Sequence, residues 1–167
     1  MKSLLTILCM LAAAAAFAIP AKEARIDCLN VGQGTALKVA DKGTAVRADT
    51  PKWMATKNPK ANLDYKGALA IFTIKGNDWQ TGTVTFTAVG DGKLNIHLMG
   101  PDVRDPQTKK RIEARVDFQK VVVNGKTVFE AQDGKSVWHD GKHFIRNIAV
   151  KDGEEIKIEV TFRPSAE

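Results

Sequence analysis

Residues 83–98 read TVTFTAVGDGKLNIHL, and this stretch decides the fold class. Val84, Phe86 and Ala88 alternate with threonines, and the alternation of apolar and polar residues resumes after Gly90-Asp91-Gly92. A period of two places every second side chain on one face of a strand, so each half predicts a strand with one buried face. Because glycine beside aspartate favours a tight reversal, we expect the two strands to form a hairpin.

The alternation continues toward the C-terminus with one change of phase. Apolar residues from Ile112 to Phe118 share one parity, whereas Val121 and Val123 fall on the other. This slip predicts a β-bulge, or a break between strands, at Gln119-Lys120.

Four dipeptides that favour a positive backbone φ mark tight turns: Asn124-Gly125, Asp133-Gly134, Asp140-Gly141 and Asp152-Gly153. The last of these is expected to close a hairpin between residues 144–150 and 156–162, since both flanking segments alternate. No segment after the first 18 residues has the i, i+3, i+4 apolar spacing of a substantial helix.

About eight short strands follow from this pattern, including one at Leu37 to Val39. We therefore expect an all-β fold, an antiparallel β-sandwich of jelly-roll type that forms one domain over residues 19–167. An irregular region is expected at about 41–66, where a long loop from Asp49 to Asp64 holds prolines, lysines and asparagines.

The first 18 residues have the pattern of a cleaved signal peptide. Lys2 precedes an apolar run from Leu4 to Phe17, and Ala16-Phe17-Ala18 is a small-x-small site, so cleavage is expected before Ile19. An uncleaved anchor is the alternative, but the run ends at Pro20 and falls short of the roughly 20 apolar residues that span a bilayer. We expect an exported protein, periplasmic or extracellular, with no transmembrane segment after cleavage.

The cysteines limit the covalent chemistry of the mature chain. Lipid attachment at Cys9 is disfavoured, because Leu8 stands where a small residue is expected, and Cys9 then leaves with the signal. Cys28 remains alone, so it cannot form an intrachain disulfide. It alternates with Ile26, which predicts a buried thiol, while a disulfide between chains is the alternative.

The charge balance is mildly basic. The chain has 25 basic and 19 acidic residues, and loss of Lys2 leaves a net charge of about +5. The densest basic stretch, Arg104 to Lys120, also contains acids and has Phe118 as its single aromatic residue. This is not the one-sided basic and aromatic pattern of a nucleic-acid surface, so we expect no nucleic-acid partner. Weak attraction to acidic polysaccharides is compatible with this charge.

Four segments in order carry a resemblance to a known family: Gly67 to Phe72, Trp79 to Ala88, Gly92 to Leu98 and Val121 to Gly125. Their arrangement resembles the galactose-binding-like jelly-roll family, the β-sandwich of many carbohydrate-binding modules, over Gly67 to Arg163. The resemblance implies a sugar site in loops at one end of the sandwich or on a concave sheet face. A structural calcium ion is common in that family, but this chain lacks a clear acidic cluster for one. Many relatives bind no sugar, so the fold leaves the function open.

Aromatic residues in turn-rich segments are the candidate ligand-binding residues. An aromatic ring can stack on the C–H face of a sugar while polar side chains bind its hydroxyls. Trp53 and Trp138 lie in such segments, with Tyr65, His139 and Asp140 as hydrogen-bonding partners. The alternative is that these tryptophans pack over the end of the sandwich. Trp79 begins a strand and is interpreted as a core residue.

Metal binding and catalysis receive little support from the sequence. His139 and His143 flank a turn, where a spacing of four does not bring two rings to one metal ion, and His97 is interpreted as a surface residue of a regular strand. No Gly-x-Ser-x-Gly motif surrounds Ser136, and Gly32-Gln33-Gly34 does not lead into a helix. We expect no catalytic residue, metal or cofactor.

The sequence favours a non-catalytic binding module for a glycan. The alternative is a structural or assembly protein of the cell envelope, or of an extracellular complex, that docks protein partners by means such as edge-strand pairing.

Overall fold

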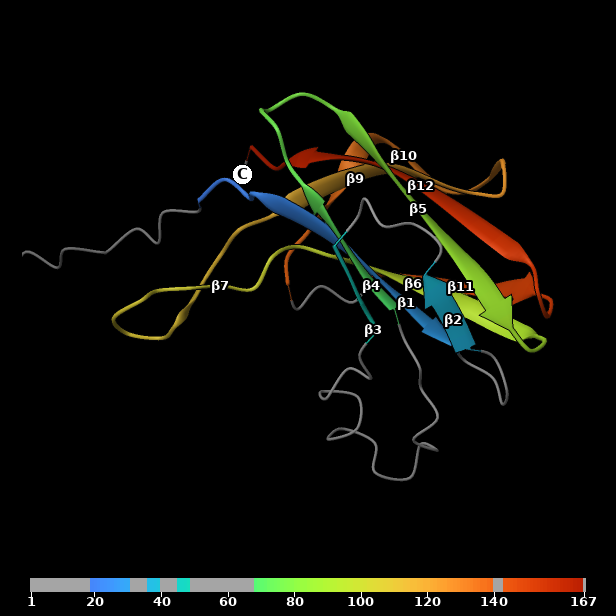
Figure 1. Cartoon of the computed structure of the whole chain (residues 1–167). Coiled ribbons are helices and arrows are strands. Elements are labelled where there is room, and N and C mark those ends of the chain that lie inside the picture. The colour runs from blue at the N-terminus through green and yellow to red at the C-terminus, as the bar shows by residue number, and fades with distance from the viewer. Residues whose placement is uncertain (1–18, 31–35, 40–44, 49–67, 140–142, 167) are drawn as a thin grey trace, which may run out of the picture.

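The computed structural model describes residues 19–30, 36–39, 45–48, 68–139 and 143–166. Two antiparallel five-stranded sheets form the two layers visible in Figure 1. Sheet A contains, in spatial order, β11 (His143–Val150), β6 (Gly92–Met99), β1 (Glu23–Asn30), β4 (Ala68–Thr73) and β3 (Ala45–Ala48). Sheet B contains β10 (Lys126–Val137), β9 (Val116–Val123), β12 (Glu155–Pro164), β5 (Gln80–Val89) and β2 (Ala36–Val39). A short pair, β7 (Val103–Arg104) with β8 (Arg111–Ile112), stands apart from both sheets.

The all-β antiparallel sandwich is confirmed, and the described residues contain no helix. The two main sheets hold ten strands where the sequence predicted about eight, and one of them, β3, lies inside the range expected to be irregular. The predicted loop from Asp49 to Asp64 lies outside the described residues. The described part of the chain has no helix with the length and apolar character that crossing a bilayer requires.

The core lies between the two sheets and contains the apolar face of each strand. Phe72 of sheet A stacks on Phe162 of sheet B with ring centroids 5.5 Å apart. A Cβ atom at Gly82 would lie 2.3 Å from the Phe72 ring, so this close approach of the layers requires glycine. Cys28 is fully buried beside Ile26, as predicted, and burial raises the pKa of its thiol.

Both hairpins predicted around glycine turns are wrong. The turn at Gly90-Asp91 joins β5 of sheet B to β6 of sheet A, and the turn at 151–153 joins β11 of sheet A to β12 of sheet B. The two turns bond to each other: Gly90 N–H donates to Asp152 Oδ1 at 2.7 Å and Asp152 N–H to Asp91 Oδ1 at 2.9 Å. Since β5 pairs with β12 and β6 with β11, two paired strands cross between the layers together, which is consistent with a jelly roll.

Two other backbone predictions are confirmed. Asn124 and Gly125 have φ of 49° and 77° and close a true hairpin between β9 and β10. In β9, Lys120 pairs with Thr161 whereas Phe118 pairs with Phe162, so Gln119 is left out of the ladder as the predicted β-bulge.

The predicted turn at Asp133-Gly134 is instead an irregularity inside β10. The register against β9 slips between Glu130 and Lys135, and Gly134 has a φ of 82°. A Cβ atom at Gly134 would lie 2.7 Å from the Trp79 ring, so the irregularity makes room for this indole.

Trp79 is not a core residue, which corrects the sequence interpretation. It lies half-buried immediately before β5, and the Arg163 guanidinium lies 4.3 Å from the centroid of its ring. Arg163 Nε in turn donates to Asp117 Oδ2 at 3.2 Å. Sequence alternation alone could not distinguish a partly covered ring on the outside of the sheet from a core residue, because both are shielded from water.

Candidate functional site

The structure places two of the five predicted ligand-binding residues. Trp138 and His139 follow directly on β10, and both are half-buried. Trp53, Tyr65 and Asp140 lie outside the described residues.

Close backbone packing positions this end of β10. Val137 pairs with Val116 of β9, and the segment that leaves β6 passes directly against it. A Cβ atom at Gly100 would lie 2.8 Å from the Ala114 carbonyl oxygen and 3.0 Å from that of Val137, so only glycine allows the approach. The consequence is that Asp102, two residues further on, lies beside His139.

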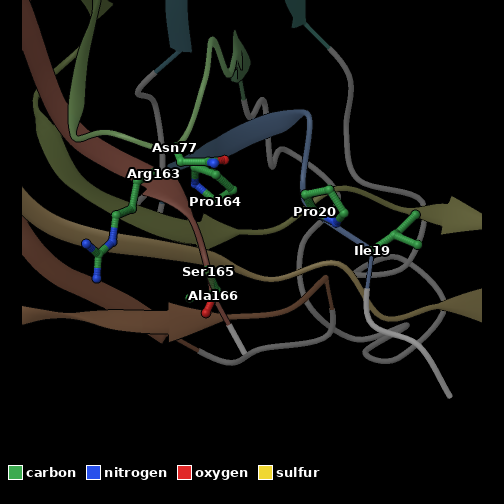
Figure 2. A pocket seen from close by; sticks show the side chains of 7 residues that line it. All are labelled: Ile19, Pro20, Asn77, Arg163, Pro164, Ser165 and Ala166. Atoms are coloured by element: carbon green, nitrogen blue, oxygen red, sulfur yellow. The ribbon is translucent and has the colours of Figure 1, made fainter. Parts of the chain in front are cut away.

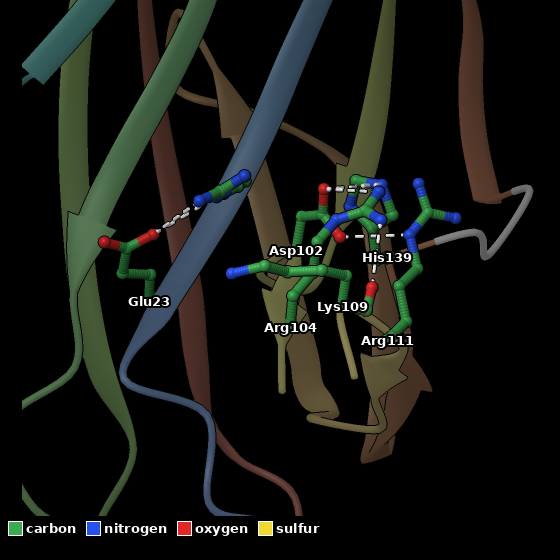
Figure 3. Close-up of polar contacts among 7 residues, drawn as sticks. Glu23, Asp102, Arg104, Lys109, Arg111 and His139 are labelled. Carbon is green, nitrogen blue, oxygen red and sulfur yellow. Dashed lines mark hydrogen bonds and ion pairs between the residues drawn. The ribbon is translucent and has the colours of Figure 1, made fainter. Parts of the chain in front are cut away.

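Asp102 is the centre of a polar cluster drawn in Figure 3, with Arg104, Arg111 and His139 turned toward its carboxylate. Arg111 Nε donates to Oδ1 at 3.0 Å, while Arg104 Nη2 and His139 Nε2 lie 3.5 and 4.0 Å from Oδ2. Partial burial alone would raise the pKa of Asp102, but the nearby His139, Arg111 and Arg104 outweigh it and lower that pKa. The carboxylate therefore stays ionised at neutral pH and holds the cationic side chains in place.

The two arginines stand on a basic arm, residues 103–112, formed by β7, β8 and the turn between them. This arm projects away from the sandwich at the left of Figure 1. In the turn, Asp105 Oδ1 accepts from the N–H groups of Thr108 at 2.6 Å and Gln107 at 2.9 Å. These bonds, first those from Thr108, lower the pKa of Asp105 and fix the turn. The exposed cations of the arm are Arg104, Lys109, Lys110 and Arg111.

Trp138 directly precedes His139 in the chain and is half-buried. Its indole Nε1 is buried and has no hydrogen-bond acceptor among the described residues. Since the nitrogen is the only polar atom of the ring, whatever ring surface solvent reaches is carbon. Such a surface can stack on the C–H face of a sugar ring.

The other histidines do not extend the cluster into a metal site. His143 packs against the Phe129 ring at 5.0 Å, and burial followed by the Lys135 charge lowers its pKa. In the described ranges, no three His, Cys, Asp or Glu side chains come together as a ligand set.

The outward face of sheet A holds buried polar residues that the sequence interpretation missed. His97 points away from the core, as its parity predicts, but it is 4% exposed and therefore not a surface residue. Its ring stacks on Phe144 at 4.2 Å. Asp27, which pairs with His97 across the ladder, is equally buried, and desolvation raises its pKa to about 7. No periodicity signals this burial, because outward positions look alike in sequence.

Two cavities lie away from the polar cluster. One of about 450 Å³ is lined by both ends of the described part of the chain, and Figure 2 shows the Arg163 guanidinium pointing away from Ile19 and Pro20 in its wall. The other, of about 730 Å³, is a groove between β10 and β11, the edge strands of the two sheets. Sequence reasoning could not find this groove, because it forms only where the two sheets end side by side.

Comparison with known proteins gives no relative: no protein-family model, curated protein or solved structure matches this chain. The class that can be stated is thus that of the fold, an antiparallel β-sandwich.

Proposed function

We propose that this chain is a non-catalytic binding module for an acidic glycan, bound by Trp138, the Asp102 cluster and the basic arm. The observation that carries the proposal is a half-buried tryptophan, with its indole nitrogen buried, next in the chain to the histidine that faces Asp102. Stacking on the indole supplies apolar contact, while fixed guanidinium groups supply hydrogen bonds to hydroxyls and carboxylates.

The charge of the cluster favours an acidic sugar over a neutral one. One carboxylate, Asp102, faces two arginines, so the cluster keeps a net positive charge before His139 is counted. The Arg104 side chain is 51% exposed and accessible to a ligand. Planar guanidinium groups bind carboxylates in two-pronged fashion, which suits uronic acids.

Binding without catalysis agrees with the chemistry of the cluster. Glycoside hydrolysis generally requires two carboxyl groups on opposite sides of the bond, one of them protonated. Among the described residues of this cluster there is one, Asp102, and its lowered pKa keeps it from acting as an acid at neutral pH.

The test is titration calorimetry of the mature chain with oligogalacturonate, and with neutral galactan as the comparison ligand. We expect Trp138→Ala to weaken oligogalacturonate binding at least about tenfold and Arg104→Ala to weaken it severalfold with a smaller salt dependence. Lys157→Ala is the matched control, because it removes an exposed cation of sheet B, and it should change nothing. Unchanged binding by a folded Trp138→Ala variant would remove this site.

Export is a further part of the proposal. The signal pattern of residues 1–18 supports cleavage before Ile19. Mass spectrometry of the protein recovered from an expressing bacterium should give a chain that begins at Ile19, and an intact N-terminus would contradict this expectation.

A further inference from the structure

The groove between β10 and β11 has an apolar floor. Val128, Ile145 and Ile148 are half-buried and pack on the core while lining the groove. The complete lining is Val123, Asn124, Lys126, Thr127, Val128, Ile145, Arg146, Asn147, Ile148, Ala149, Val150, Glu154 and Ile156. None of these residues is aromatic, so the groove offers no platform for stacking a sugar.

The charges at the groove rim are not balanced within the described chain. Lys126 and Arg146 are exposed and have no carboxylate partner among the described residues, although Arg146 lies 4.9 Å over the Phe144 ring. The acid of the lining, Glu154, accepts from Lys151 N–H at 2.8 Å and Asn124 Nδ2 at 3.1 Å, and with Lys126 and Arg146 it leaves the lining with a net charge of +1. The groove therefore complements an apolar ligand that carries negative charge.

The walls of the groove are strand edges. Among the described strands, β10 pairs only with β9 and β11 only with β6, so their other backbone edges have no ladder partner. A ligand with its own N–H and C=O groups can satisfy such edges, whereas an acyl chain cannot.

Irregularities in β10 and β11 limit the length of a peptide strand that could pair with their free edges. The register of β11 slips between Ile145 and Ile148, where Asn147 has a φ of 62°. The register of β10 slips between Thr127 and Phe129. Such bulges prevent a long added strand but leave room for a short extended segment.

We propose that this groove docks a short extended segment of a partner protein, with aliphatic side chains on its floor and aspartate or glutamate opposite Lys126 and Arg146. This site is separate from the proposed glycan site, so either can fail without the other.

The test uses a fluorescein-labelled octapeptide that alternates valine or isoleucine with aspartate, and fluorescence anisotropy with the mature chain. A peptide with lysine in place of aspartate and one with serine in place of the aliphatic residues are the comparison probes. We expect only the acidic aliphatic peptide to bind, with an affinity that falls as salt is added.

Ile148→Ser should weaken peptide binding at least about tenfold, while Ile19→Ser, an exposed isoleucine outside the groove, is the matched control and should not. Should Ile148→Ser fail to fold, the surface double variant Lys126→Ala with Arg146→Ala provides the same test and should remove the salt dependence. Trp138→Ala should bind the peptide normally, which separates this site from the glycan site. Equal binding of the acidic and basic peptides, no binding up to about 1 mM, or preferential binding of oleate would overturn the proposal.

Discussion

Outward residues of β5 in sheet B and of β1 and β6 in sheet A come from the same alternating pattern but lie in different environments. On sheet B, the outward threonines of β5 are exposed or half-exposed, and Thr83 and Thr85 pair with Glu159 and Lys157 of β12. On sheet A, the outward residues Asp27 of β1 and Asn95 and His97 of β6 are buried, with exposures of 4 to 6%. A period of two thus identifies the residues that avoid the core, but not whether water reaches them.

Burial on sheet A has an energetic consequence at Asp27. This carboxyl pairs with Leu69 on β4 and with His97 on β6, and no hydrogen bond to it is present in the described part of the chain. The nearest outward cation on its own strand, Arg25, is bonded to Glu23 at 2.8 and 3.2 Å. Desolvation without compensation therefore raises the pKa of Asp27 from 3.8 to about 7.

The largest expected effect is the pH dependence that Asp27 gives to stability. Well below pH 3.8 the carboxyl is neutral in the folded and unfolded states. As the pH rises further, the unfolded chain ionises first while the folded chain keeps its proton, so stability falls until about pH 7 and then levels off. Asp27→Asn removes this loss, and its advantage in the free energy of unfolding should grow by about 3 kcal/mol between about pH 5 and about pH 8.

Urea unfolding at the two pH values measures this difference. Asp78→Asn is the matched control, because Asp78 is exposed in the loop before β5. An Asp27→Asn advantage that is the same at both pH values would show that Asp27 is solvated, and the contrast between the two faces would disappear.

The second effect compares one outward residue from each sheet. His97→Ala removes a buried ring that stacks on Phe144, so we expect a loss of about 2–3 kcal/mol in the free energy of unfolding. Thr85→Ala removes a half-exposed outward side chain of sheet B and should change stability by less than about 1 kcal/mol. Equal losses in chemical denaturation would contradict the difference in burial.

A smaller effect is expected at Asn95, the second buried polar residue of β6. Its Oδ1 accepts the Asn147 N–H at 2.9 Å, where β11 is bulged. Asn95→Ala leaves this donor without its acceptor and should lower the free energy of unfolding by about 1–2 kcal/mol. Hydrogen exchange of the Asn147 amide should accelerate in the variant, and unchanged protection would show that the bond does not hold the bulge.

The smallest effect is expected for an ion pair on the solvated face. Lys157 Nζ lies 3.1 Å from Glu159 Oε1, and the two side chains are 50% and 35% exposed. Lys157→Ala should therefore change the free energy of unfolding by no more than about 0.5 kcal/mol. The shift in melting temperature measures this change. A loss of stability as large as that for His97→Ala would show that the outward face of sheet B is buried at this position as well.

Local sequence signals predicted the strands and their inward faces but not the pairing between strands. The bulge at Gln119 and the turn at Asn124-Gly125 follow from parity and from residues that tolerate positive φ. Similar turn residues at Gly90-Asp91 and Asp152-Gly153 indicate that the chain reverses its direction. They do not indicate which sheet the next strand joins. That choice depends on β12 and β11, which lie more than 40 residues away from β5 and β6 in sequence.

The candidate site was predictable only in part for the same reason. Trp138 and His139 are conspicuous because an aromatic ring stands in a turn-rich segment. Asp102 lies 37 residues earlier, and only the tight packing of Gly100 against the end of β10 brings it to His139. No local pattern contains that contact.

The most direct test of the proposed function is a two-dimensional ¹H–¹⁵N NMR titration of residues 19–167 with oligogalacturonate. We predict progressive shifts of the Trp138 indole N–H signal and of amides in residues 102–111, with no change along β5. Shifts confined to the threonine face of sheet B, or none in the Trp138 segment while the glycan binds, would contradict the proposal.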